Sequence, residues 1–280
     1  MNKHLLYEGR KIHYNTYGIG KPVFLIHGFG EDSAVWNNQV DFLKPKFKLI
    51  VPDLPGSGSS EMIDDMSMEG MAEVIHFIMH EETQNKNIKI SESSEVPPSG
   101  GFRGAVIGHS MGGYITLALA EKYWNHIDAF GLIHSTAFAD SEEKKAVRRK
   151  GIEFILKNGA FEFLKTATPN LFSEEFKDKE PVFLGEYIST LDNFSPDALV
   201  KYYKAMMQRP DRTAILKNTN VPVLFIMGKY DNAIPVNDGL KQCHLPGKTY
   251  FHILKHSGHM GMLEESAATN CVLEKFLLEN

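Results

Sequence analysis

Ser110 lies at the centre of a short glycine-flanked motif that could carry out nucleophilic chemistry. The short apolar run 103–107 precedes it and a helix-like run, 113–120, follows it. Gly108 and Gly112 stand two residues to either side, where a tight strand-to-helix turn leaves no room for a Cβ atom. Such a turn exposes the seryl oxygen above a helix N-terminus. The motif therefore predicts a nucleophile, although a passive serine in a glycine-rich turn would have the same pattern.

A serine nucleophile needs a base, because a free hydroxyl is scarcely ionised at neutral pH. Histidine titrates in the right range, and the chain contains 12 histidines. We favour His259, since Gly258 lets its loop turn the ring towards the serine, over His256 three residues earlier. A carboxylate must then hold the imidazole in the right tautomer. Asp231 directly follows an apolar strand and is the preferred acid; Asp140 is the alternative, and an ordinary turn residue is the other interpretation of Asp231.

The oxyanion formed by serine attack needs backbone donors close to the nucleophile. The apolar strand 23–26 ends at His27, and Gly28 then lets the backbone turn out of the sheet. We expect the N–H of Phe29 to point at a ligand there, and the N–H of Met111, the residue after the serine, to be the second donor. The His27 ring is expected to tie this loop together rather than to take part in the chemistry.

Strand-like and helix-like segments alternate along the chain and predict the elements that position these residues. Strands are expected at 5–8, 11–17, 23–26, 47–53, 103–107, 127–134, 221–228 and 249–254. The predicted fold class is α/β, with a mostly parallel sheet covered by helices on both faces. Because ligands bind beyond the carboxyl ends of strands in such sheets, the loops that carry Phe29, Ser110, Asp231 and His259 are expected to meet at one edge.

The expected domain organisation is a core interrupted by a helical block. Residues 1–134 and 217–280 carry the strands, whereas residues 135–216 are charged and helical, with no convincing core strand. A block of this size suits a lid over the sheet edge. Within the first part of the core, residues 83–102 lose all periodicity and are expected to form a solvated surface insertion.

A second glycine-rich stretch, at residues 54–60, follows the strand that ends at Asp53. It lacks the lysine of a G-x-x-x-x-G-K-[ST] loop and the helix of a dinucleotide fingerprint, so we expect no nucleotide site and expect Asp53 to brace the loop. Cys243 and Cys271 lack zinc-site spacing and predict reduced core residues rather than a disulfide. No cofactor and no metal are expected.

The composition excludes several classes of protein. The chain has 280 residues, of which 42% are hydrophobic and 23% charged, as is typical of a soluble globular protein. Its net charge of −5 argues against a nucleic-acid partner, because a phosphate-binding surface needs a basic excess. With no run of 18 apolar residues and no apolar leader, we expect no membrane span and a cytoplasmic location. The expected partner is a small-molecule substrate; the oligomeric state stays open.

Taken together, these motifs resemble the α/β-hydrolase superfamily over nearly the whole chain. The resemblance rests on His27-Gly28-Phe29, Asp53-Leu54-Pro55-Gly56, Gly108 to Gly113, Gly228 to Asp231, and Gly258-His259 with Glu264. It implies a serine-nucleophile, esterase-like member with Ser110, Asp231 and His259 in the family's order of nucleophile, acid and histidine. It also implies a helical cap at 135–216. Two departures are Ser57, where the family commonly has a histidine, and the length of the irregular insertion.

The resulting functional prediction is a serine hydrolase that cleaves a small or medium carboxylic ester through an acyl-enzyme intermediate. A C–C bond hydrolase, a lactonase or a perhydrolase with the same triad is an alternative, and so is a ligand-binding receptor with little turnover. Cationic groups near the serine would favour C–C chemistry, but the arginines of the helical block are expected on solvated surface: Arg148, Arg149, Arg209 and Arg212. Apolar residues of this block could shape a hydrophobic pocket, although most are expected to be its core: Phe138, Phe154, Phe161, Phe163, Leu164, Phe172, Met206 and Met207.

Overall fold

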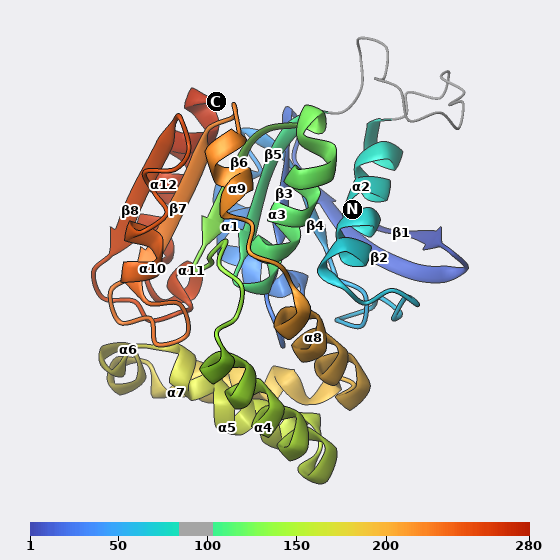
Figure 1. Cartoon of the computed structure of the whole chain (residues 1–280), viewed down its shortest axis with the longest axis vertical. Coiled ribbons are helices and arrows are strands. Elements are labelled where there is room, and N and C mark those ends of the chain that lie inside the picture. Colours follow the sequence, from blue (N-terminus) through green and yellow to red (C-terminus); the bar gives the residue numbers. More distant parts are fainter. Residues whose placement is uncertain (84–102) are drawn as a thin grey trace.

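The computed structural model describes residues 1–83 and 103–280, which form an eight-stranded sheet with helices on both faces (Figure 1). Residues 84–102, which hold nearly all of the insertion predicted at 83–102, lie outside the described residues. The strands are β1 (Asn2–Tyr7), β2 (Arg10–Tyr17), β3 (Lys21–Ile26), β4 (Phe47–Pro52), β5 (Gly104–His109), β6 (Ile127–Ile133), β7 (Val223–Gly228) and β8 (Thr249–Leu254). The predicted α/β fold class is therefore confirmed.

The sheet order is β1-β2-β4-β3-β5-β6-β7-β8. β1 pairs antiparallel with β2, and β2 pairs antiparallel with β4. From β4 to β8 all neighbouring strands run parallel. The carboxyl ends of β3, β5, β6, β7 and β8 therefore lie along one edge, as expected for the loops of the predicted site.

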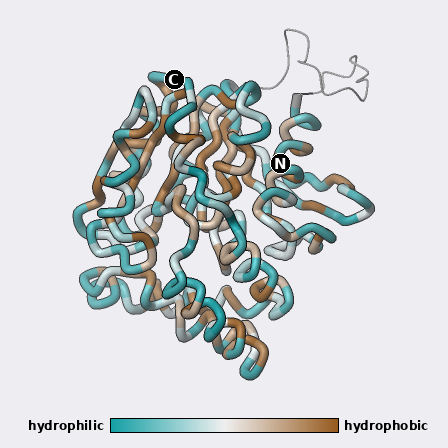
Figure 2. Tube along the Cα trace, viewed as in Figure 1, coloured by the Kyte–Doolittle hydropathy of each residue, from teal (hydrophilic) through white to brown (hydrophobic). Residues whose placement is uncertain are grey.

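The central strands are buried on both faces, which explains why their sequences are continuous apolar runs. In β3, Phe24 and Ile26 join the apolar cluster on one face, whereas Val23 and Leu25 join the cluster on the other. Figure 2 shows hydrophobic residues gathered along these strands and hydrophilic residues along the outer turns. Burial on both faces holds the strand ends, and thus the loops after them, in place.

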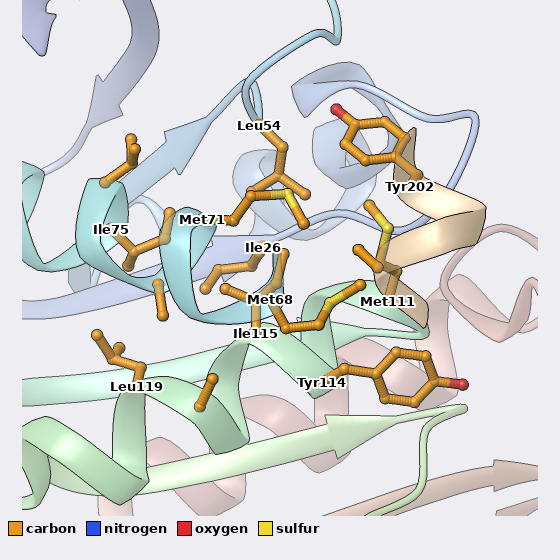
Figure 3. Packing of buried hydrophobic residues seen from close by; sticks show 14 of the residues in the cluster. Ile26, Leu54, Met68, Met71, Ile75, Met111, Tyr114, Ile115, Leu119 and Tyr202 are labelled. Carbon is orange, nitrogen blue, oxygen red and sulfur yellow. The ribbon is translucent and has the colours of Figure 1, made fainter. Parts of the chain in front are cut away.

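Helices of the core pack on both sides of this sheet. They are α1 (Asn37–Leu43), which follows the short helix η1 (Ser33–Trp36), α2 (Met68–Thr83), α3 (Met111–Tyr123), α10 (Val236–Leu240), α11 (Gly261–Glu264) and α12 (Ser266–Glu279). α2 and α3 pack together over one face, where Met71 and Ile75 lie near Ile115 (Figure 3). α1 and α12 pack over the other face. α2 begins directly after Ser67, whose hydroxyl accepts from the Gly70 N–H at 3.0 Å.

The chain between β6 and β7 is helical. Its helices are α4 (Glu142–Asn158), α5 (Ala160–Ala167), η3 (Thr168–Leu171), α6 (Glu174–Lys179), α7 (Pro181–Ser189), η4 (Thr190–Asn193), α8 (Pro196–Gln208) and α9 (Thr213–Asn218). The helices from α4 to α8 lie together at one end of the sheet, in the lower part of Figure 1, whereas α9 packs against α3 of the core in the upper part. The Tyr202 hydroxyl of α8 donates to the Pro55 carbonyl and lies 2.9 Å from the Ser57 hydroxyl. The helical segment is thus fastened to the loop after β4.

A buried ion cluster joins the beginning and the end of this helical segment. Asp140 accepts from Arg148 Nε at 2.6 Å and from Arg209 Nη1 at 2.9 Å, and its side chain is fully buried. Arg209 Nη2 also donates to the Phe138 carbonyl at 3.0 Å. Its guanidinium carbon lies 3.7 Å from the centroid of the Tyr114 ring on α3. The cluster therefore fixes both ends of the segment to the core.

The expectation that these arginines lie on solvated surface is wrong for Arg209 and Arg212, which are 5% and 3% exposed. Arg212 pairs with Glu69 and Glu121, so each guanidinium has carboxylate partners that offset the cost of burying its charge. Arg149, in contrast, has a side chain that is 54% exposed. Periodicity alone did not reveal these partners, because the glutamates lie on α2 and α3, far away in the sequence.

Replacement of Asp140 by alanine is expected to destabilise the fold by about 3 kcal/mol, because two cations would lose their buried partner. The measurement is the free energy of unfolding from urea titrations followed by circular dichroism. Glu142→Ala is the matched control, since Glu142 is exposed at the start of α4 and its removal should leave the midpoint unchanged. Equal midpoints for the two variants would contradict a structural role for the cluster.

Cys243 and Cys271 are both free, as predicted. The expectation that both are core residues is wrong, because Cys243 is half-buried and Cys271 is exposed. On α12, Leu273 and Phe276 face the sheet, and helical spacing turns Cys271 away from it. Among the helices of residues 1–83 and 103–280, none is long and apolar enough to cross a membrane.

Candidate active site

Ser110 occupies the turn between β5 and α3 with φ +50° and ψ −113°. A positive φ is uncommon for a residue other than glycine and costs about 1–3 kcal/mol. The turn is held by its neighbours: the Ser110 N–H donates to the Ile133 carbonyl at 2.9 Å, and its own carbonyl accepts from the Ser135 hydroxyl at 2.8 Å. Ser110 thus stands on a strained turn, and its backbone hydrogen bonds with Ile133 of β6 and with Ser135 hold that turn in shape.

The glycines of the motif are required by close backbone contacts. A Cβ atom on Gly108 would lie 2.3 Å from the carbonyl oxygen of Gly112. A Cβ atom on Gly112 would lie 2.3 Å from the carbonyl oxygen of Ile26 and 2.6 Å from that of His27. The end of β3 therefore touches the first turn of α3, which brings the loop that carries Phe29 beside the serine turn.

Asp231 and His259, although 28 residues apart, meet in a buried hydrogen bond. His259 Nδ1 donates to Asp231 Oδ2 at 2.8 Å, and the two residues are 4% and 6% exposed. Asp231 Oδ1 accepts from the N–H groups of Ala233 and Ile234, both at 2.8 Å, which aim the carboxylate. Within the described residues, the His259 ring is bonded to Asp231 and not to Ser110. Catalytic hydrogen bonds of the latter kind often tighten only when substrate is bound.

Burial and charge act in opposite directions on this pair. Burial raises the pKa of Asp231, but the charge of His259 and the hydrogen bonds from His134 and His259 outweigh it and hold that pKa well below its usual range. Burial lowers the pKa of His259, whereas Asp231 and, less strongly, Glu31 and Glu264 raise it, and the net shift is upward. Asp231 is therefore ionised at neutral pH beside an imidazole of increased basicity.

Glu31 and His109 form a buried pair that sequence reasoning missed. Glu31 Oε2 accepts from the Gly28 N–H at 2.6 Å and from His109 Nδ1 at 3.0 Å. On the other side of the ring, His109 Nε2 lies 3.0 Å from the carbonyl oxygen of His259. The pair thus connects the loop after β3, the residue before Ser110 and the loop after β8.

His134 is a second buried residue that sequence reasoning missed. It follows the last residue of β6, and its Nδ1 lies 3.1 Å from Asp231 Oδ2. The signal in the sequence was its position, because a histidine at the carboxyl end of a predicted strand lies on the same sheet edge as Ser110.

Phe29 packs against the helical segment between β6 and β7. Its ring stacks on Tyr203 of α8, with centroids 4.3 Å apart and planes 8° apart. Phe163 and Tyr202 contact the same ring edge-on, at centroid distances of 6.2 and 6.3 Å. Met111 is the first residue of α3, so its N–H has no acceptor one turn earlier in the helix. These two N–H groups remain the predicted oxyanion donors.

The supporting roles predicted for His27 and Asp53 are confirmed. His27 Nε2 accepts from the Leu54 N–H at 2.9 Å and so ties the loop after β3 to the loop after β4. Asp53 accepts from the N–H groups of Ser33 at 3.0 Å and Ser59 at 2.9 Å. Both residues stabilise loops around the site.

The alternative base and acid lie elsewhere. His256 Nδ1 lies 2.9 Å from Glu175 Oε2, and its side chain is 62% exposed. Asp140 is bound by Arg148 and Arg209 in the ion cluster. Both are thus engaged with groups other than Ser110, Asp231 and His259.

His134, Asp231 and His259 also form the one group of three possible metal ligands among the described residues, with donor atoms within 4.8 Å of one another. Hydrogen bonds between these atoms account for the spacing, since both Nδ1 atoms face the same carboxylate oxygen. The arrangement therefore needs no ion to explain it.

A cavity of about 380 Å³ lies beside the Glu31 side of the site, between the core and the helical segment. Its lining residues come from the loop after β3, from η1, α1, α7, η4 and α11, and include Glu31, Asp32, Val35, Phe183, Tyr187, Leu191, Phe194 and Leu263. Its volume suits a small molecule.

Comparison with known proteins identifies related chains. Residues 23–270 match the family model described as the alpha/beta hydrolase family. Over 53 residues, 19% of this chain and 22% of the relative, the chain is 47% identical to a pimeloyl-[acyl-carrier protein] methyl ester esterase of Legionella pneumophila (strain Corby); this match spans about a fifth of that enzyme. Lipase 3 of Moraxella sp. (strain TA144) is 26% identical over 268 residues, 92% of this chain and 78% of the lipase. The solved structure of a thermophilic esterase from Thermogutta terrifontis superposes with a TM-score of 0.86 at 24% identity, covering 100% of this chain and 98% of the esterase.

Proposed function

Because this chain belongs to the alpha/beta hydrolase family, we propose that it is a serine hydrolase that cleaves small or medium carboxylic esters through an acyl-enzyme intermediate. The observation that carries the proposal is the buried 2.8 Å hydrogen bond between His259 and Asp231, at the sheet edge where Ser110 stands on its strained turn. The relatives named as a methyl ester esterase and a lipase support an ester as the substrate class.

In the proposed mechanism, His259 Nε2 takes the proton from Ser110 Oγ as this oxygen attacks the ester carbonyl. The N–H groups of Phe29 and Met111 stabilise the oxyanion. His259 then gives the proton to the leaving alkoxide, and the C–O bond of the ester breaks to leave an acyl-serine. Water attacks this acyl group while His259 takes its proton, and the acid is released as the proton returns to Ser110. Asp231 stays ionised throughout and stabilises the imidazolium.

We further propose that residues 135–216 act as a cap over a core formed by residues 1–134 and 217–280. Two contacts support this division. Tyr203 stacks on Phe29, and the Leu171 carbonyl accepts from the His259 N–H at 2.6 Å. The segment therefore touches the loops of the proposed oxyanion hole and of the proposed base, so a change in its position would reach both.

The partners of the buried arginines favour an ester over the β-diketone-like carboxylic acid that a C–C bond hydrolase cleaves. Recognition of an acid substrate would need a free cation near Ser110. Arg148 and Arg209 instead pair with Asp140, and Arg212 pairs with two glutamates. Each of these three guanidinium groups is thus engaged by a carboxylate of the fold, which supports a neutral substrate.

Covalent labelling combined with turnover tests the proposed function. A fluorophosphonate probe is expected to label Ser110, as located by mass spectrometry, and p-nitrophenyl esters of short and medium acyl chains are expected to be hydrolysed. A β-diketone acid and a lactone, assayed in parallel, distinguish the other hydrolases. Labelling without turnover of any substrate would identify a receptor, and turnover with label on another residue would overturn the role of Ser110.

A further inference from the structure

His134 is fully buried and takes no part in the steps described above. Its φ is +49°, in the left-handed region that residues other than glycine rarely adopt. Its N–H donates to the Ile226 carbonyl of β7 at 2.8 Å, which helps to hold this conformation. Both the strained backbone and the burial of a polar ring cost free energy unless interactions of the ring offset them.

Hydrogen bonds fix the tautomer of the His134 ring. The Gly261 N–H can only donate, and it donates to His134 Nε2 at 3.2 Å. Nε2 therefore carries the lone pair, and the proton of the neutral ring lies on Nδ1. Nδ1 donates to Asp231 Oδ2 at 3.1 Å. Burial lowers the pKa of His134 to about 4 against the opposing effect of Asp231, so the ring remains a neutral donor at neutral pH.

Only a glycine allows this approach from the loop after β8. A Cβ atom on Gly261 would lie 2.4 Å from His134 Nε2. Gly261 stands two residues after His259, and Asp231 stands in the loop after β7. The His134 ring therefore bridges the two loops that carry the proposed acid and the proposed base.

We propose that His134 is a positioning residue that sets the basicity of His259 by sharing Oδ2 of Asp231 with it. This inference rests on the proposed function. Both imidazole Nδ1 atoms donate to the same oxygen, at 2.8 Å from His259 and 3.1 Å from His134. A second donor stabilises the carboxylate charge and so weakens the attraction of Asp231 for protonated His259. Loss of the second donor raises the pKa of His259.

Two other titratable side chains near the trio, His109 and Glu264, have partners of their own. The His109 ring of β5 lies 5.9 Å from His134 and 5.0 Å from His259, between centroids, and is paired with Glu31. Glu264 of α11 accepts from the backbone N–H groups of neighbouring loops. Because substitution of His134 removes none of these bonds, a change in pH dependence reports on the bond to Asp231.

The test compares His134→Leu with His134→Asn. Leucine removes the donor, whereas the Nδ2 group of asparagine can donate from the place of Nδ1, and asparagine tolerates a positive φ. With p-nitrophenyl acetate, His134→Leu is expected to move the acid limb of the kcat/KM profile upward by about one pH unit. It should also lower kcat by about tenfold with little change in KM. His134→Asn is expected to keep both parameters within about threefold of the parent.

If the role of His134 were purely structural, its substitution would change the stability of the protein and leave the acid limb of the kcat/KM profile in place. An unmoved acid limb in folded His134→Leu, or equal impairment of both variants, would overturn the proposal. If His134→Leu does not fold, ¹H–¹⁵N NMR of the unmodified protein decides: a proton on Nδ1 of His134 between pH 5 and 9 supports the proposal, and a proton on Nε2 overturns it. The Ser110→Ala variant tests the proposed function separately, since its retained turnover would overturn that function whatever His134 does.

Discussion

Replacement of Ser110 by alanine is expected to lower kcat for ester hydrolysis by about 10⁵-fold. The members of a serine triad act as a unit, and direct attack by water on the ester does not make up for the lost nucleophile. Alanine is nearly the same size as serine and adopts the positive φ of this turn about as readily, so the fold should persist. The Ser110 N–H and carbonyl keep their bonds to Ile133 and Ser135 in either case. The measurement is steady-state hydrolysis of p-nitrophenyl acetate, with thermal unfolding as a check on folding.

Ser59→Ala is the matched control for this variant. Ser59 is an exposed serine in the loop after β4, and its backbone N–H, rather than its hydroxyl, binds Asp53. Its replacement should leave kcat unchanged. Near-normal turnover by Ser110→Ala would show that the nucleophile lies elsewhere, and a loss of activity in both variants would point to a general effect on the protein.

Replacement of Asp231 by asparagine is expected to lower kcat by about 10⁴-fold, because the amide would place an N–H group where only an acceptor fits. Oδ1 accepts from two backbone N–H groups and Oδ2 accepts from His134 and His259. If the amide oxygen faces the backbone, its NH₂ group faces both rings. His259 would then carry its proton on Nε2 and could not accept the proton of Ser110.

The same substitution is expected to destabilise the fold by about 1–3 kcal/mol, because His134 cannot adopt the other tautomer without placing Nε2–H against the Gly261 N–H. Urea unfolding measures this loss. Asp238→Asn is the control, since Asp238 lies in nearby α10 with a partly exposed side chain that is 3.6 Å from its ion-pair partner, Lys144. A decrease in kcat of less than tenfold for Asp231→Asn, with Asp238→Asn unchanged, would contradict the role of Asp231.

The candidate site is held together by buried hydrogen bonds and by one aromatic contact between its loops and the helical segment. Glu31 connects the loop after β3 with His109, and His109 connects the serine turn with His259. Tyr203 connects the helical segment with Phe29. The proposed serine chemistry needs such a rigid frame, because small displacements of the reacting groups cost large factors in rate.

The fold could be predicted from the sequence, and three candidate residues of the site could be placed at one sheet edge, because both depend on local patterns. Continuous apolar runs predict strands buried on both faces, and the structure has such strands at β3, β5 and β7. In a parallel sheet, the residues after such strands lie at one edge whatever the exact packing. This rule places Ser110 in the turn after β5 and brings Asp231 and His259 together, and the structure shows the hydrogen bond between these two.

The burial of Arg209 and Arg212, the pairing of Glu31 with His109, and the bond from His134 to Asp231 follow only from the tertiary structure. The paired groups lie far apart along the chain: 78 residues separate Glu31 from His109, and 97 separate His134 from Asp231. Sequence patterns report which face of an element is apolar, but they do not report which polar side chains meet across loops. The sequence by itself thus determined the sheet and the candidate triad, whereas packing between distant loops decided which buried polar groups bond to the residues of that triad and to the loops around it.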